Sequence, residues 1–302
     1  MEKTRTRTDL LDPFLVAQLG GIELVARGIV EGFLAGMHKS PFPGYSVEFT
    51  EDRPYQSGDD LRYLDWKMLA RSDRMFVKQF EEETNMRSML VVDVSASMDW
   101  AGSEDVLSKL DYAKRLVAAL GLVLLRQRDA TGLIAFDEDV RTVVRAGARS
   151  NHWWNLVKAI QELGAGGGTA AEPALLKVTS LLRRRGLVVL VSDLLFDREL
   201  VLRALHYLRH RGHQVYVLHI MDPAEFVLDG PPEALFRDPE SGTGVIARPR
   251  ELRSVYHQTV KNAIESWRAE CRRGGIYYHH VLTSTPFGHV LRELSARSSR
   301  LG

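Results

Sequence analysis

The stretch that most constrains the fold is Met89–Met98, which reads MLVVDVSASM. Four apolar residues run directly into Asp93, after which Ser95 and Ser97 alternate with small residues. A continuous apolar run bounded by polar residues is typical of a strand buried on both faces, and open α/β sheets build their sites at the carboxyl ends of such strands. The carboxylate and the two hydroxyls suit a hard divalent cation such as Mg²⁺. The alternative is that they only form a turn or cap a helix.

Composition excludes several classes of protein. The chain has 302 residues, of which 45% are hydrophobic and 26% charged, as in ordinary globular proteins. Lys and Arg total 40 against 39 Asp and Glu, so no basic excess points to nucleic acid. Arginine clusters at Arg183–Arg185 and Arg272–Arg273 are explained by solvated helix ends.

The sequence predicts a cytoplasmic protein without a membrane span. Cys271 is the only cysteine, so there is neither an internal disulfide nor a zinc site built on cysteines. Met1–Asp9 is charged and does not resemble a signal peptide. The apolar segment Phe14–Met37 is predicted to be an amphipathic helix rather than a spanning one, because it carries charges at four-residue spacing, Glu23, Arg27 and Glu31.

From Arg87 onward, apolar runs alternate with helical periodicity. The predicted strands are Ser88–Val92, Thr131–Phe136, Val140–Val144, Leu187–Val191, Gln214–Ile220 and Ile276–Leu282. The predicted helices are Val106–Gln127, Asn151–Leu163, Glu172–Arg184, Arg198–His210, Arg250–Arg272 and Phe287–Arg297. This alternation predicts an α/β fold with a doubly wound, mostly parallel sheet.

We expect two parts, an N-terminal α+β region at residues 1–86 and the α/β unit at residues 87–302. Whether the first part folds separately or wraps onto the second stays open. It contains predicted strands at Ser46–Thr50 and Met75–Phe80. Its charged segment Arg53–Trp66 holds Asp59, Asp60 and Asp65 among arginines, which favours structural ion pairs over a metal site. Residues 222–249 depart from the alternation and predict a hairpin insertion, with strands at Leu235–Asp238 and Gly244–Ala247.

Two further loops carry oxygen donors. Thr169 follows the glycine run that begins at Gly164, where no Gly-Lys-Ser/Thr follows to make a phosphate-binding P-loop. Its simpler role is the N-cap of the next helix. Asp193 ends the strand Leu187–Val191, which can lie beside the strand that ends at Val92. The five donors then meet in one crevice, where Mg²⁺ or Mn²⁺ would be left one ligand short: Asp93, Ser95, Ser97, Thr169 and Asp193.

These motifs resemble two known families. The DVSAS sequence, the threonine after the glycine run and the strand-terminal Ser192-Asp193 resemble the metal-ion-dependent adhesion site of von Willebrand factor A domains. The stretch from Gly44 to Met98 resembles the bacterial "domain of unknown function 58" family, through Glu48-Phe49, Arg53-x-Tyr55, Gly58-Asp59-Asp60-x-Arg62, Asp65-Trp66 and Ala70-Arg71.

The resemblance implies a function and a partner. It implies a non-enzymatic, metal-dependent protein–protein interaction module that acts in a chaperone-like or adaptor role with a MoxR-type AAA+ ATPase. The bound divalent cation would take an acidic residue of the partner, and the site residues carried over are the five donors named above. Many members of the family have membrane helices before the motif, whereas we expect none here.

The sequence allows two alternatives. A Mg²⁺-dependent phosphatase or nuclease could use the same crevice with Asp93 as nucleophile, but none of the three loops offers a lysine to hold a phosphoryl group. His206, His210 and His213 share a helical spacing suited to a transition metal, but exposed histidines at a helix end explain them more simply.

Overall fold

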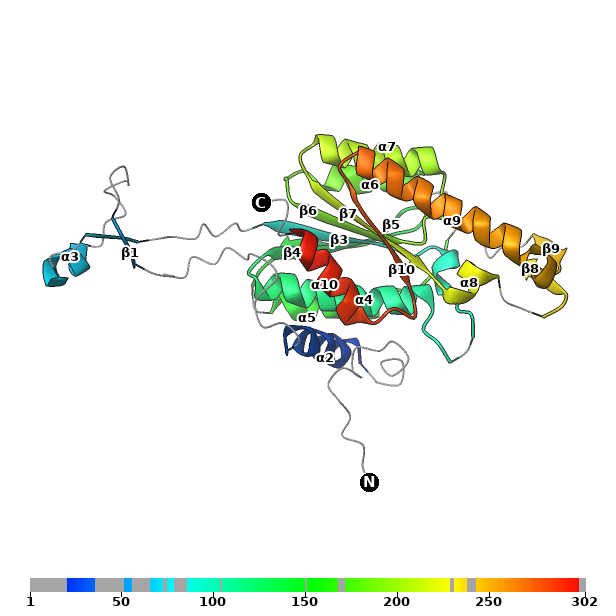
Figure 1. The fold of residues 1–302 in the computed structure, drawn as a ribbon, viewed down its shortest axis with the longest axis horizontal. Helices are drawn as coiled ribbons and strands as arrows, with labels where there is room; N and C mark the ends of the chain where they lie inside the picture. The colour runs from blue at the N-terminus through cyan, green and yellow to red at the C-terminus, as the bar shows by residue number, and fades with distance from the viewer. Residues whose placement is uncertain are drawn as a thin grey trace, which may run out of the picture.

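The core of the protein is a six-stranded sheet with helices on both faces (Figure 1). The computed structural model describes residues 21–35, 52–55, 66–72, 75–78, 86–103, 105–149, 151–167, 172–228, 231–237 and 243–298. The strands, in their order across the sheet, are β10 (Tyr277–Leu282), β7 (Gln214–Met221), β6 (Leu187–Ser192), β3 (Arg87–Asp93), β4 (Ala130–Phe136) and β5 (Val140–Gly147). All neighbours are parallel except β4 and β5. The predicted α/β fold with a mostly parallel sheet is confirmed.

The strand order places a topological switch point between β3 and β6. Counted along the chain, the six strands lie in the order 3-2-1-4-5-6, so the connections leave β3 and β6 in opposite directions. These two strands pair in parallel with Val92 opposite Val191. The sequence prediction that the two strands are neighbours is therefore confirmed, and their carboxyl ends meet where doubly wound folds bind ligands.

Each face of the sheet packs against its own set of helices (Figure 1). One face carries α4 (Lys109–Arg126), α5 (His152–Gln161) and α10 (Phe287–Ser298), and the other carries α6 (Glu172–Leu181), α7 (Arg198–His210) and α9 (Pro249–Arg273). The helical periodicity of α4 explains its place, because its apolar side chains, from Leu110 to Leu124, are buried in the first cluster.

The helix α2 (Ile22–Ala35) belongs to the same core as α4. Its side chains Val25, Ile29 and Phe33 are buried in the cluster that α4 and α5 build. This part of the N-terminal region therefore packs onto the α/β unit, while the boundary at residue 86 stays a prediction for the rest. Phe14–Gly20, Ser46–Thr50, Asp59, Asp60 and Asp65 lie outside the described residues.

Two short strands and a helix are described between α2 and the sheet. The strands β1 (Asp52–Pro54) and β2 (Phe76–Lys78) pair in antiparallel fashion, which confirms the centre of the strand predicted at Met75–Phe80. The helix α3 (Trp66–Ser72) lies between them in sequence and begins with an exposed tryptophan.

Several predicted boundaries were wrong. The helix after the DVSAS loop begins at Lys109 rather than Val106, because the Ser108 side chain caps it by accepting the N–H of Asp111. The helix α6 ends at Leu181 rather than Arg184. Within the predicted insertion, the hairpin is confirmed as β8 (Ala234–Arg237) paired with β9 (Gly244–Ala247), but an unpredicted helix, α8 (Pro223–Val227), precedes it. No helix in the described ranges is both long and apolar enough to cross a lipid bilayer.

Candidate metal and interaction site

Asp93 is fixed at the end of β3 by hydrogen bonds to both of its carboxylate oxygens. Its Oδ1 accepts the N–H of Ser95 at 2.9 Å, and its Oδ2 accepts the hydroxyl of Ser192 at 2.6 Å. The chain then enters a short 3-10 helix, Ala96–Asp99, which holds the hydroxyls of Ser95 and Ser97 at 3.1 Å from each other. The sequence pattern Asp-x-Ser-x-Ser thus becomes a buried set of oxygen donors.

Asp193 is presented by a strained turn at the end of β6. The hydroxyl of Ser192 accepts the N–H of Leu194 at 2.9 Å, and Leu194 has a positive φ of 55°, which is unusual for a leucine. The Oδ1 of Asp193 accepts the N–H of Leu195 at 3.3 Å. Backbone strain of this kind is kept only where the surroundings fix it, and it is common at functional sites.

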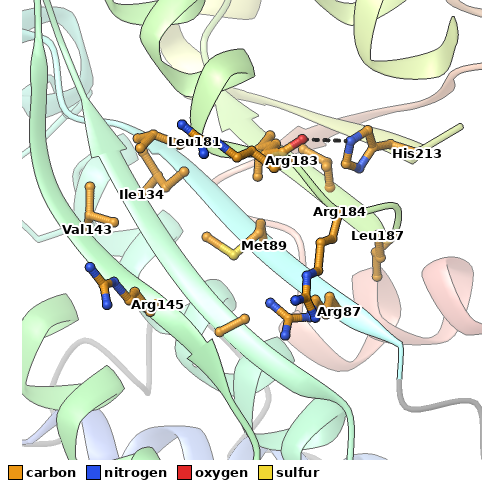
Figure 2. A pocket seen from close by; sticks show the side chains of 13 residues that line it. Arg87, Met89, Ile134, Val143, Arg145, Leu181, Arg183, Arg184, Leu187 and His213 are labelled. Atoms are coloured by element: carbon orange, nitrogen blue, oxygen red, sulfur yellow. Dashed lines mark hydrogen bonds between the residues drawn. The ribbon is translucent and has the colours of Figure 1, made fainter. Parts of the chain in front are cut away.

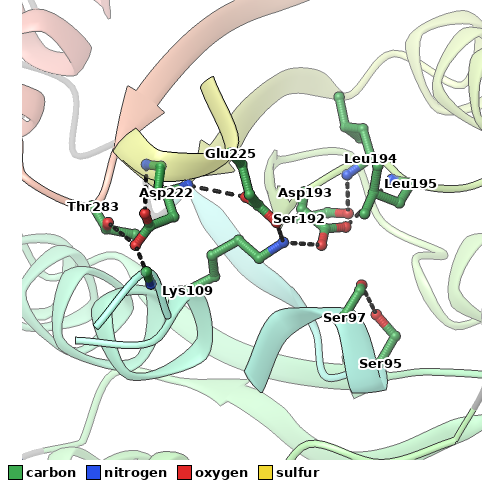
Figure 3. A network of polar contacts seen from close by, with 12 residues as sticks. Ser95, Ser97, Lys109, Ser192, Asp193, Leu194, Leu195, Asp222, Glu225 and Thr283 are labelled. Carbon is green, nitrogen blue, oxygen red and sulfur yellow. Dashed lines mark hydrogen bonds and ion pairs between the residues drawn. The ribbon is translucent and has the colours of Figure 1, made fainter. Parts of the chain in front are cut away.

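Lys109 joins this cluster from the first turn of α4. Its side chain is only 1% exposed, and its ammonium lies 2.8 Å from Asp193 Oδ2 and 2.6 Å from Glu225 Oε1 (Figure 3). Burial lowers the pKa of Lys109, but the negative charges of Asp193 and Glu225 outweigh that effect, so its pKa is raised. The lysine is therefore held as an ammonium.

Glu225 is placed by the short helix α8. Asp222 caps this helix by accepting the N–H of Ala224, and the Glu225 carboxylate accepts the N–H of Asp222 in return, which makes a capping box. Asp222 also accepts hydrogen bonds from the N–H of Gly102 and the hydroxyl of Thr283. The turn before α4 and the end of β10 are thereby tied to the same cluster (Figure 3).

The charges of this cluster do not balance. Burial, and then the negative charge of nearby Asp193, raise the pKa of Asp93 to about 7, while the hydrogen bonds from Ser192 and Ser95 lower it. His219 cannot compensate, because burial lowers its pKa to about 3 and keeps the ring neutral. The ammonium of Lys109 is shared by Asp193 and Glu225, whereas the hydrogen bonds to Asp93 come from the neutral donors Ser95 and Ser192. Asp93 and Asp193 supply two carboxylates and Ser95 and Ser97 two hydroxyls, and this set of hard oxygen donors fits Mg²⁺ or Mn²⁺.

The structure brings four of the five predicted ligands together: Asp93, Ser95, Ser97 and Asp193. Thr169 lies outside the described residues. The glycine loop that leads to it is bonded to the Asp93 loop, since the N–H of Gly166 reaches the carbonyl of Val94 at 2.9 Å and the N–H of Ala96 reaches that of Gly167 at 3.2 Å. Gly167 has a φ of 73°, and a side chain there would meet Asp137. Gly167 thus permits the close approach of the glycine loop to Asp137, in the turn between β4 and β5.

Three members of the cluster were not predicted: Lys109, Ser192 and Glu225. The Asp222-Pro-Ala-Glu225 spacing is a capping-box signal that the sequence does contain. Lys109 had no such signal, because it stands at the start of an otherwise apolar helix face. The absence of a lysine holds for the three loops, but α4 brings one to the crevice, where two carboxylates already engage it.

The histidine prediction needs one correction. His206 and His210 are exposed on α7, but His213 is buried, and its Nε2 lies 3.1 Å from the carbonyl of Leu182. Within the described part of the chain, no group of three or more His, Cys, Asp or Glu side chains is placed to hold a metal.

Comparison with known proteins assigns the family. The model of the family described as "Protein of unknown function DUF58" matches residues 51–266. The chain belongs to the DUF58 family. The uncharacterized protein Mb1516 of Mycobacterium bovis is 29% identical over 272 residues, which cover 88% of this chain and 83% of that protein.

Solved structures of other bacterial proteins are also similar to this chain. BatB from Bacteroides thetaiotaomicron is 18% identical with a TM-score of 0.46, covering 71% of this chain and 99% of that one. A von Willebrand factor type A protein from Catenulispora acidiphila is 16% identical with a TM-score of 0.39, covering 70% of this chain and 42% of that one. The motif and the strand order together make the α/β unit of this DUF58 protein von Willebrand A-like.

Proposed function

We propose that this DUF58 protein is a non-enzymatic, metal-dependent protein–protein interaction module. One Mg²⁺ or Mn²⁺ would be held by Asp93, Ser95, Ser97, Thr169 and Asp193, and the cation supplies a coordination position for a carboxylate of the partner. The observation that supports this most strongly is the buried cluster at the switch point, where oxygen donors carry more negative charge than Lys109 can balance.

The arrangement favours binding over hydrolysis. Both carboxylate oxygens of Asp93 already accept hydrogen bonds, from Ser95 and Ser192, so the group is oriented as a ligand rather than freed as a nucleophile. The ammonium of Lys109 is held between two carboxylates and is not directed toward an open position for a phosphoryl group. No observation in the described residues supports the phosphatase or nuclease alternative.

The partner we propose is a MoxR-type AAA+ ATPase, with which the protein would act as an adaptor or chaperone-like factor on target proteins. This proposal rests on the family resemblance. The site adds a chemical requirement, because the residue that completes the metal must be an Asp or Glu of the ATPase or of its target.

Calorimetry with MgCl₂ and MnCl₂ tests the metal. We expect one cation per chain in the wild type and loss of binding in the double variant Ser95→Ala/Ser97→Ala. Ser180→Ala is the matched control, because this exposed serine on α6 bonds only its own helix. Equal binding by the double variant and the control would place the metal elsewhere.

Association with the purified ATPase tests the partner. We expect binding in Mg²⁺ that is lost in EDTA and in Asp193→Asn, mainly through faster dissociation, since a docked carboxylate is partly desolvated. Association that ignores both EDTA and Asp193→Asn would refute the metal-bridged mechanism even if the two proteins do bind.

A further inference from the structure

A second candidate binding site lies at the opposite end of β3 from Asp93. A cavity of about 360 Å³ opens between the end of α6 and the strands β3 to β5 (Figure 2). Arg87 and Met89 of β3 line it, and they stand six and four residues before Asp93, about 20 and 13 Å away at ~3.3 Å per residue. Leu181, the last residue of α6, and the segment that follows it form one wall of the cavity.

The floor of the cavity is apolar. It is formed by Met89, Ile134 and Val188 of the sheet and by Leu182, which follows α6. On the outer strand β5, the side chain of Val143 also lines the cavity and is 46% exposed. Apolar surface of this kind, enclosed on several sides, is typical of ligand pockets, whose volumes run from about 300 to 1,000 Å³.

The rim of the cavity is strongly basic. Arg87, Arg145, Arg183 and Arg184 line it, and no acidic residue does. All four are exposed, and within the part of the chain that the structure describes none of them forms an ion pair. Figure 2 shows Arg87 and Arg184 beside each other, with Arg145 across the cavity from them on β5. Because the whole chain carries a net charge of only +1, this is a local concentration of charge that an anionic ligand would balance.

The neighbouring backbone favours an extended ligand. Among the described strands, β5 is at the edge of the sheet and pairs only with β4. An edge strand offers free N–H and C=O groups to an added strand, and alternate side chains of that strand can enter pockets beside it. Val143 and Arg145 stand two residues apart on β5 and so share the face that lines the cavity.

We propose that this cavity binds an extended peptide segment of a protein partner in which apolar and acidic residues stand two positions apart, so that both kinds of side chain face the cavity. The apolar side chains of a strand added to β5 would cover Val143, and its carboxylates on the same face would pair with Arg145 and Arg184. This docking surface is separate from the metal site and needs no divalent cation.

Fluorescence anisotropy with labelled synthetic peptides, in EDTA, tests the proposal. The probe repeats Leu-Ser-Asp-Ser, which places Leu and Asp on one face of the strand, and the two control peptides replace Leu by Ser or Asp by Lys. We expect the probe to bind at least tenfold more tightly than either control and to weaken with added salt, since exposed charges are screened. Equal affinity for the serine peptide would show that the apolar floor of the cavity is not used, and would overturn the proposal. Equal affinity for the lysine peptide, or no binding of the probe, would overturn it as well.

Charge-reversal variants locate the binding surface. Arg145→Glu/Arg184→Glu should weaken probe binding at least tenfold. The matched control Arg126→Glu/Arg272→Glu makes the same charge change at exposed arginines that do not line the cavity, and it should bind as the wild type does. Circular dichroism verifies the folding of both variants, and Val143→Ser, which changes no charge, tests the same surface independently. An equal loss of probe affinity in both charge variants would refute the assignment. Wild-type affinity in both Arg145→Glu/Arg184→Glu and Val143→Ser would refute it too. Binding to phosphatidylglycerol vesicles that the probe does not displace would identify a membrane rather than a peptide as the ligand, and would also overturn it.

Discussion

Replacing Lys109 by Met should have opposite effects on folding and on metal binding. Methionine keeps the length and apolar stem of lysine but removes the ammonium that contacts Asp193 and Glu225 at 2.8 and 2.6 Å. Removing one partner of a buried ion pair costs about 3–5 kcal/mol, because it leaves a buried charge uncompensated. Glu225 is 24% exposed and can be hydrated, so we expect the lower end, about 3 kcal/mol, for the protein in EDTA.

The same substitution should strengthen Mg²⁺ binding. The ammonium and the cation would share the Asp193 carboxylate, so removing the ammonium frees that carboxylate and removes a like charge. Contacting unit charges interact by about 4 kcal/mol at an effective dielectric constant of about 20. A tenfold gain in affinity needs only about 1.4 kcal/mol of this, and we expect at least that gain.

Urea unfolding with and without metal measures both effects. Because a ligand of the native state stabilises it according to its affinity, a tenfold gain adds about 1.4 kcal/mol in excess Mg²⁺. The deficit of Lys109→Met should therefore be about 3 kcal/mol in EDTA and at least ~1.4 kcal/mol smaller in Mg²⁺. Lys158→Met is the control, since this lysine is exposed, its contact with Glu162 is 3.9 Å long, and it should change stability little in either buffer. An equal deficit in both buffers would refute a shared Asp193, and a larger deficit in Mg²⁺ would mean that Lys109 supports the metal.

Two further predictions concern the scaffold. Leu190→Ala, in the buried centre of β6, should lower the unfolding free energy by about 2–5 kcal/mol through the cavity it leaves. Leu195→Ala, at an exposed position, should change it by less than about 0.5 kcal/mol. Equal losses of the two variants in urea unfolding would contradict the division into core and site. Burial raises the pKa of Asp129 to about 6, so the folded protein binds this proton more tightly than the unfolded chain does, and stability should fall as pH rises from about 4 to about 6. Asp129→Asn should remove that loss and be the more stable protein at pH 7 in thermal unfolding, and an unchanged pH profile would show that another group is responsible.

The sequence predicts the centre of the sheet well because strands β3 and β6 are almost wholly apolar. Runs such as Leu187–Val191 have no polar face, so they could only be central strands, and the donors at their ends mark the edge where a site forms. Strand β5 is different, because its exposed and half-buried residues alternate, and its antiparallel pairing with β4 follows from the tight turn at Asp137–Asp139.

The ion pair of Lys109 could not be predicted from the sequence. Its partners, Asp193 and Glu225, lie 84 and 116 residues further along the chain, and only the folded sheet brings them to the start of α4. A lysine at the start of a helix is ordinarily exposed, so neither its spacing nor its neighbours distinguish it. The end of α6 was missed for a similar reason. Leu182 lies just after the end of the helix and is buried. Its carbonyl forms a hydrogen bond with His213, a residue 31 positions away.

The two proposed surfaces bind a partner by different chemistry, so their contributions to its affinity can be measured separately. Both would take acidic residues, but at opposite ends of β3, one through a cation at Asp93 and the other directly through arginines beside Arg87. EDTA removes only the first interaction, and Arg145→Glu/Arg184→Glu removes only the second. If a partner uses both, each treatment alone should lower its affinity and the two together should cost about the sum of the separate free energies, because the sites are more than 10 Å apart and share no residue. A partner that loses all binding with either treatment alone would instead show that the two surfaces act as one unit, coupled through β3.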